Sequence, residues 1–167
     1  MRRRRISNSL KVILIIGLIT FIMASVVLAD CYQLLKQLAI NRISLVIDRS
    51  GSMKGQLLAQ AKIGAKAFIQ HMRADDRASV IEFGSQVNLV TSPTRSKADL
   101  QNAIDQLKAE GATALYDAMA RATLLLAHQP GSKIVVFLTD GSDNFSRYTL
   151  SDLQKMNVSE GVFVYGI

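Results

Sequence analysis

The chain has 167 residues, enough for one domain and an appendage, and 49% of them are hydrophobic, which is enough for a packed core. The single cysteine, Cys31, excludes an internal disulfide, and no Cys/His spacing predicts a zinc site. Arg2 to Arg5 and Lys11 supply much of the net charge of +7. The later charges of both signs are interspersed without a basic stripe, so we expect no nucleic-acid binding.

The first segment of the chain predicts a membrane anchor. Residues 1–11 are basic, and residues 12–29 contain no charged side chain. As a helix this run spans about 27 Å, close to the ~30 Å hydrocarbon core and longer than the usual apolar region of a signal peptide. We therefore expect a single-pass cell-membrane protein with residues 1–11 in the cytoplasm and residues 30–41 as a juxtamembrane spacer. The alternative is a domain secreted after signal cleavage.

The first half of the exported part is predicted to contain a strand, a helix and a hairpin. Arg42 to Ile47 is apolar and partly β-branched, which predicts a buried strand. Lys54 to Arg73 carries apolar residues near helical spacing and predicts an amphipathic helix. Arg77 to Phe83 and Val87 to Val90 flank a Gly-Ser-Gln turn and predict a hairpin, which Pro93 is expected to end.

The second half alternates helices with strands. Ser96 is expected to cap a helix that Gly111 ends, and Ala114 to Ala127 predicts a second helix. Lys133 to Leu138, with the sequence KIVVFL, is apolar on both faces, which is typical of the centre of a parallel sheet. A short helix and a last strand follow, at Leu150–Asn157 and Val162–Ile167.

This order of elements predicts an α/β fold. We expect a doubly wound, mostly parallel sheet with one antiparallel edge hairpin, preceded by one transmembrane helix. Sites in such sheets form outside the carboxyl ends of the strands, near the point where the strand order reverses. Asp48 and Asp140 follow the two strands that are expected to be most central. Their side chains are therefore predicted to lie side by side.

Three polar loops are predicted to meet at that edge: Asp48 to Ser52, Gly111 to Thr113, and Thr139 to Asp143. The hydroxyls of the first loop alternate along the chain, so they share one side of an extended segment. Carboxylate and hydroxyl oxygens, without thiol or imidazole, suit a hard divalent cation. The sequence therefore predicts a cation site.

The segments DRSGS, GATALYDA and FLTDGSDN together resemble the von Willebrand factor A-type domain and its metal-ion-dependent adhesion site. The resemblance covers residues 42–167 and implies that Mg²⁺, with Mn²⁺ or Ca²⁺ as alternatives, is bound by Asp48, Ser50, Ser52, Thr113 and Asp140. It also implies capture of a protein ligand whose acidic side chain reaches the cation. The last strand and the closing helix of the family are missing here, so we expect a fragment, a truncated product or a strand completed by another chain.

Three alternatives to adhesion remain open: a docking or assembly subunit of an envelope complex, a metal-dependent enzyme, and a degenerate site with a purely structural role. His71 and His128 are not paired with a nucleophile, and no phosphate-binding loop is present. We therefore expect a protein that is not an enzyme.

Two acids near the site have an open role. We expect Asp117 to be a solvent-facing helix charge, with bonding to loop amides as the alternative. We expect Asp143 to be a turn residue, with support of the site as the alternative. Discrimination between ligands is assigned to the loops around Ser92–Thr94 and Ser142–Tyr148.

Overall fold

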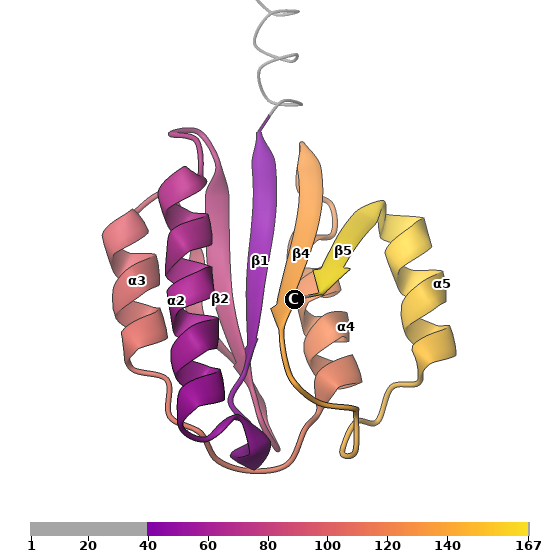
Figure 1. Ribbon diagram of the computed structural model, residues 1–167. Helices are drawn as coiled ribbons and strands as arrows, with labels where there is room; N and C mark the ends of the chain where they lie inside the picture. The colour runs from indigo at the N-terminus through magenta and orange to yellow at the C-terminus, as the bar shows by residue number, and fades with distance from the viewer. Residues whose placement is uncertain (1–39, 167) are drawn as a thin grey trace, which may run out of the picture. The chain divides into compact units, whose positions relative to one another are not determined.

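The computed structural model describes residues 40–166, which form a five-stranded sheet between two layers of helices (Figure 1). The predicted tail and anchor, and nearly all of the predicted spacer, fall in residues 1–39. These segments lie outside the described residues and stay predictions. Within residues 40–166, no helix has the length and apolar character needed to span a membrane.

The sheet has the strand order β3-β2-β1-β4-β5. Its strands are β1 (Asn41–Asp48), β2 (Arg77–Phe83), β3 (Val87–Thr94), β4 (Ser132–Leu138) and β5 (Val162–Gly166). All neighbours pair in parallel except β2 and β3, which form the antiparallel hairpin at one edge. The predicted α/β class and the predicted mostly parallel sheet are therefore confirmed.

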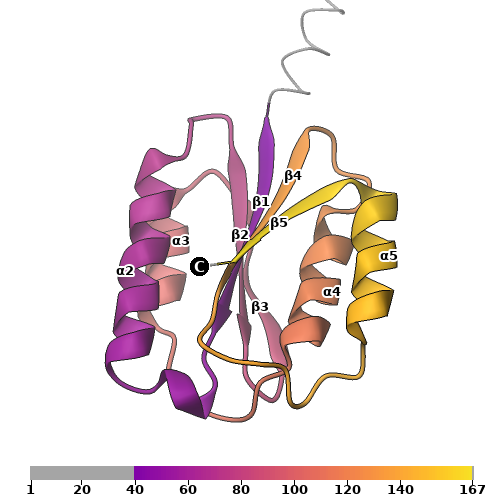
Figure 2. The same cartoon turned by 45° about the vertical axis from the view of Figure 1, so that its right-hand side comes forward.

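Helices cover both faces of the sheet (Figure 2). On one face lie α2 (Gln56–His71) and α3 (Lys97–Asp105), and on the other lie α4 (Leu115–Leu126) and α5 (Leu150–Glu160). Alternate residues of β1 serve the two cores: Leu45 and Ile47 pack with α2 and α3, whereas Val46 packs with α4. A strand that is buried on both faces must be apolar throughout, which is why β1 reads as a continuous apolar run.

The predicted end of the hairpin is wrong. Pro93 does not end the hairpin, because β3 continues to Thr94. A proline is tolerated there because β3 is the edge strand and one side of its backbone needs no partner. Thr94 is paired with Ala78, near the start of β2, so the Ser92–Thr94 segment lies at the end of the sheet opposite to Asp48. It cannot select ligands at the predicted site.

The predicted end of the helix at Gly111 is also wrong. Ser96 does cap α3, since its Oγ accepts the backbone N–H of Asp99 at 3.2 Å. The helix nevertheless ends at Asp105, and Leu107, which belongs to the loop that follows, is buried. Gly111 lies in that loop with φ +87°, a left-handed conformation that suits glycine.

Strand β5 forms the second edge of the sheet within the described residues. Phe163 and Tyr165 are 61% and 57% exposed, so the helices of the described residues do not fully cover this strand. They are paired with Ile134 and Val136 of β4, which pack toward α2 and α3. This strand lies at the opposite side of the sheet from the β2–β3 hairpin.

Candidate metal centre

The candidate site lies where the adjacent strands β1 and β4 end. The two strands remain in register from Asn41 with Ser132 to Ile47 with Leu138, so their carboxyl ends coincide. Asp48 is the last residue of β1 and is fully buried, whereas Asp140 lies two residues beyond β4 and is exposed. The predicted proximity of these two acids follows directly from that pairing.

A continuous chain of hydrogen bonds joins the two loops. The Ser50 backbone N–H donates to Asp48 Oδ1 at 2.7 Å. The Oγ atoms of Ser50 and Ser52 lie 3.1 Å apart, and Ser52 Oγ donates to Asp140 Oδ1 at 3.0 Å. On the other side, Thr139 Oγ1 donates to Asp48 Oδ2 at 2.6 Å. The hydroxyls and both carboxylates therefore face a common point at the edge of the sheet.

Thr113 reaches the same point from a third loop. A methyl group placed on Gly141 would lie 3.9 Å from Asp48 Oδ2 and 3.9 Å from Thr113 Oγ1. These two oxygens therefore flank one small space, which the missing side chain of Gly141 leaves open. All five predicted side chains are thus brought together at one edge of the sheet.

The loop that carries Ser50 and Ser52 and the loop that carries Thr113 are also joined through their backbones. The Gly51 N–H donates to the Gly111 carbonyl at 2.9 Å, and the Glu110 N–H donates to the Arg49 carbonyl at 2.6 Å. After Ser50 the chain turns through a short 3₁₀ helix, η1 (Gly51–Met53), which anchors Met53 in the core. The positions of the serine hydroxyls are therefore fixed by backbone bonds on both sides.

Within residues 40–166, no basic side chain forms an ion pair with Asp48, so the charge on its carboxylate is not compensated. In that part of the chain its carboxylate accepts from neutral donors, a backbone amide and the Thr139 hydroxyl. Arg49, next in the chain, is turned away: its Nη1 lies 2.8 Å from Glu110 Oε1 and its Nε lies 3.2 Å from Glu82 Oε1. A buried carboxylate without a cationic partner is costly, so this environment favours a bound cation.

The donor set fits a hard cation. Within residues 40–166, no three His, Cys, Asp or Glu side chains gather into a metal-binding group, so any coordination here beyond the two carboxylates must use neutral oxygens, such as the hydroxyls. Neighbouring oxygens around an octahedral Mg²⁺ at about 2.1 Å lie about 3 Å apart. The oxygens of Ser50, Ser52 and Asp140 have that spacing, at 3.1 and 3.0 Å. Their chemistry and spacing are therefore compatible with one Mg²⁺.

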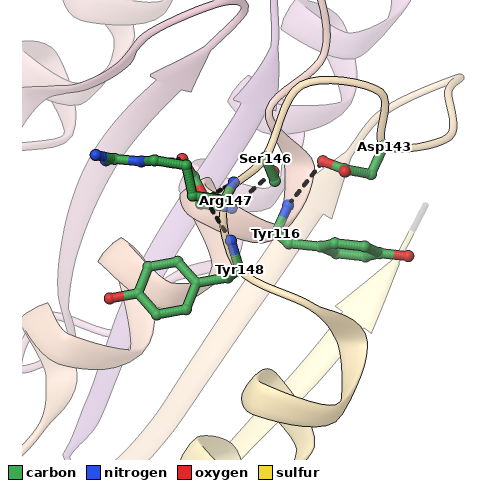
Figure 3. Close-up of polar contacts among 6 residues, drawn as sticks. Tyr116, Asp143, Ser146, Arg147 and Tyr148 are labelled. Carbon is green, nitrogen blue, oxygen red and sulfur yellow. Dashed lines mark hydrogen bonds and ion pairs between the residues drawn. The ribbon is translucent and has the colours of Figure 1, made fainter.

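The loop after Asp140 is bonded to the first turn of α4 (Figure 3). Ala114, the N-cap of α4, has no capping side chain, and residues of the loop cap the helix instead. Asn144 Oδ1 accepts from the Thr113 N–H at 2.9 Å, Asp143 Oδ1 from the Tyr116 N–H at 3.3 Å, and Ser146 Oγ from the Asp117 N–H at 3.0 Å.

Asp117 in turn accepts hydrogen bonds from the loop. Its Oδ1 accepts the backbone N–H groups of Arg147 at 2.8 Å and Tyr148 at 3.1 Å. Its side chain is only 14% exposed, so the expected solvent-facing charge is wrong and the alternative, bonding of loop amides, is correct. Asp143 likewise does more than form a turn, because it caps α4. The loops that carry Thr113 and Asp140 therefore behave as one unit.

Sequence reasoning missed two residues of the site. Thr139 holds Asp48 in place, and its Oγ1 also accepts the Gly141 N–H at 3.2 Å. Asn144 exchanges two bonds with Thr113, through its side chain and through its own backbone N–H. Only the position of Thr139 beside Asp140 hinted at its role. Asn144 gave no signal, because a polar residue in a loop is ordinary.

Comparison with known proteins identifies the family of this chain. The model of the von Willebrand factor type A domain matches residues 43–142, which include all five predicted side chains. The chain belongs to the von Willebrand factor type A (VWA) domain family. VWA domains generally act in protein–protein interaction and adhesion, which agrees with the expectation of a binding protein rather than an enzyme.

Individual relatives support the same assignment. An uncharacterized protein of Synechocystis is 35% identical over 112 residues, which cover 65% of this chain and 26% of the relative. The human inter-alpha-trypsin inhibitor heavy chain H2 is 29% identical over 135 residues, 73% of this chain and 14% of the relative. The chain thus spans about a quarter or less of these relatives.

A solved VWA structure confirms the fold. The von Willebrand factor type A protein from Catenulispora acidiphila superposes with a TM-score of 0.67 at 23% identity, covering 77% of this chain and 33% of that one. At this identity the similarity describes the architecture of the VWA domain alone.

Proposed function

We propose that this chain is a membrane-anchored, extracytoplasmic VWA domain that captures a protein ligand through a divalent cation. Mg²⁺ is the cation favoured by the donor set, with Mn²⁺ and Ca²⁺ as alternatives, and Asp48, Ser50, Ser52, Thr113 and Asp140 would hold it. In this proposal the apolar run of residues 12–29 is the membrane anchor.

The observation that carries the proposal is the buried and uncompensated carboxylate of Asp48. Within residues 40–166 its hydrogen-bond donors are neutral, and the neighbouring Arg49 is occupied by Glu82 and Glu110. A fold that keeps a negative charge in such a place, with hydroxyls arranged around it, has a local charge that a cation would neutralise.

The composition of the site favours adhesion over metal storage. Two carboxylates balance the charge of a divalent cation, and the three hydroxyls are neutral. A bound cation would therefore remain electrophilic and would supply a strong charge-assisted contact to an acidic side chain of a partner. Asp140 and Ser52 are exposed, so the chain leaves this edge of the sheet accessible to such a partner.

The test is capture of proteins by the full chain from envelopes of cells that express it, in magnesium and in chelator. Asp48→Ala and Asp140→Ala should each abolish Mg²⁺ binding and divalent-dependent capture while the domain remains folded. Asp99→Ala, which removes an exposed carboxylate from α3, is the matched control and should capture as the unmodified chain does.

Other outcomes would redirect the assignment. Capture that persists in chelator and in both Asp variants would contradict adhesion through a cation. Capture that needs an ATPase partner but not the cation would favour an assembly subunit. Turnover of a substrate that is lost with Asp48→Ala would favour a metal-dependent enzyme.

A further inference from the structure

A groove of about 640 Å³ lies next to the candidate metal centre. It is bounded by residues 85–88, which cover the end of the β2–β3 turn and the start of β3, by one side of α4, and by Phe145, Arg147 and Tyr148 of the loop after β4. Ala114, the residue after Thr113, is part of its lining, so the groove begins one residue from a predicted cation ligand. Its volume is within the range of ligand pockets.

The wall formed by the loop is held rigidly. The loop caps the first turn of α4 and is bound in return by Asp117, as described above. Figure 3 shows the side chains of Arg147 and Tyr148 extending from the loop on the opposite side from the ring of Tyr116. The groove is therefore formed before any ligand arrives, which lowers the entropic cost of binding.

The groove offers apolar surface to a ligand. Leu124 of α4 is 54% exposed, and Phe145 and Tyr148 of the loop are 57% and 38% exposed. The small residues Ala114 and Ala120 also line the groove. A partner side chain that covers this surface removes apolar area from water, and exposed aromatic residues of this kind often anchor protein interfaces.

The charge of the groove selects the partner. Arg121 is exposed, and it has no hydrogen bond or ion pair with any residue in the part of the chain that the structure describes. The side chain of Arg147 is 90% exposed, with a single contact of 3.4 Å from Nε to Asp117 Oδ2. The Asp117 carboxylate is already engaged by the loop. The groove therefore presents net positive charge.

From these contacts we propose that the groove binds an extended acidic peptide segment of the partner protein. One acidic residue of the segment reaches the candidate metal centre, an aromatic or aliphatic residue packs on Leu124 at the far end of the groove, and a second acidic residue pairs with Arg121. The first of these contacts rests on the function proposed above; the other two need no cation.

The dimensions fix the spacing of such a motif. From Ala114 to Leu124 the helix rises about 15 Å at ~1.5 Å per residue. An extended peptide covers that length in about four or five residues at ~3.3 Å each. The acidic residue at the metal and the apolar residue at the far end of the groove are therefore expected within about five positions of each other.

The test selects ligands for the full chain from a displayed library of random dodecapeptides in magnesium. We expect enrichment of peptides that carry an acidic residue and, within about five positions, an aromatic or aliphatic residue. The affinity of a selected peptide is then measured by fluorescence anisotropy for the unmodified chain and for variants. Leu124→Asp should weaken binding by about tenfold or more.

Two further comparisons make the assignment specific. Arg121→Glu should weaken binding, and replacing the second acidic residue of the peptide by lysine should restore it. Ile63→Asp is the matched control, because Ile63 is 69% exposed on α2, which packs on the opposite face of the sheet from α4. It should bind the peptide as the unmodified chain does.

The two proposals fail differently. If chelator or Thr113→Val abolishes binding, but Leu124→Asp and Arg121→Glu leave it unchanged, the groove is overturned and the cation-dependent function is kept. If Leu124→Asp reduces binding, but chelator leaves it unchanged, the groove is supported and the role of the cation is overturned. A selection without the acidic and apolar pattern overturns the inference, as does self-association of the chain through Leu124.

Discussion

Asp117 should stabilise the domain by fixing the loop after β4, and its replacement by alanine tests this directly. The substitution removes the acceptor of two backbone N–H groups, those of Arg147 and Tyr148. It also removes a negative charge from the first turn of α4, where the helix dipole favours one. Both effects lower the stability of the folded state.

The size of the effect follows from the exposure of the partners. Hydrogen bonds to charged groups contribute about 1.5–3 kcal/mol each, but Arg147 and Tyr148 are exposed, so water can replace part of what is lost. The ion pair with Arg147 adds little, because that side chain is 90% exposed. We expect Asp117→Ala to lower the free energy of unfolding by about 2 kcal/mol. For a domain of this size the loss corresponds to a fall in Tm of roughly 6–10 °C.

Two variants separate the contributions. Asp117→Asn retains one acceptor oxygen for the loop amides and should cost about half as much. Asp99→Ala removes a carboxylate from the matching position in the first turn of α3, where the side chain accepts no hydrogen bond within residues 40–166. It reports the contribution of the helix dipole alone, about 0.3–1 kcal/mol.

Urea unfolding and amide hydrogen exchange are the assays. Exchange at the amides of Arg147 and Tyr148 should accelerate in Asp117→Ala more than exchange in the sheet. If Asp117→Ala and Asp99→Ala lowered the stability equally, and the two amides kept their protection, the loop would not depend on Asp117. The rigid groove wall inferred from these bonds would then be wrong as well.

Three further predictions concern neighbouring positions. Gly141→Ala should fold normally, because the new methyl group meets only ordinary contacts at 3.7 and 3.9 Å, but calorimetry should find Mg²⁺ binding weakened, since the methyl group fills the space between Asp48 and Thr113. Gly84→Ala should lower the unfolding free energy by about 1–3 kcal/mol in chemical denaturation, because its methyl group would lie 2.6 Å from a backbone carbonyl, while Gly166→Ala, in open space, should not. Hydrogen bonds from Thr149 lower the pKa of Asp152, so the stability they contribute is present above the ordinary Asp pKa and is lost as pH falls through the lowered value. The difference in unfolding free energy between the unmodified chain and Thr149→Val should therefore shrink in acid. A difference that stays constant with pH would contradict this.

The fold was predictable because its central strands carry an unambiguous pattern. A strand buried on both faces is continuously apolar, so β1 and β4 stand out in the sequence, and their parallel pairing follows from the helices between them. The acids at their ends could then be brought together from topology alone. The predicted proximity of Asp48 and Asp140 rests on nothing more specific.

The remaining features depend on tertiary contacts that local sequence does not encode. Pro93 reads as a strand end, yet an edge strand accepts it. Asp117 reads as a surface helix charge, yet the loop after β4 folds over it and supplies its partners from 30 positions away. The capping of α4 by a distant loop likewise leaves no signal near Ala114.

The most direct test of the central claim compares thermal unfolding of the full chain with that of Asp48→Asn, in chelator and in magnesium. Without cations the variant should be at least as stable as the unmodified chain, because it removes a buried charge whose partners in the described part of the chain are neutral. Magnesium at about a hundred times its Kd should stabilise only the unmodified chain, by about 2.7 kcal/mol. Equal responses of both proteins to magnesium would contradict the proposal that Asp48 holds a cation.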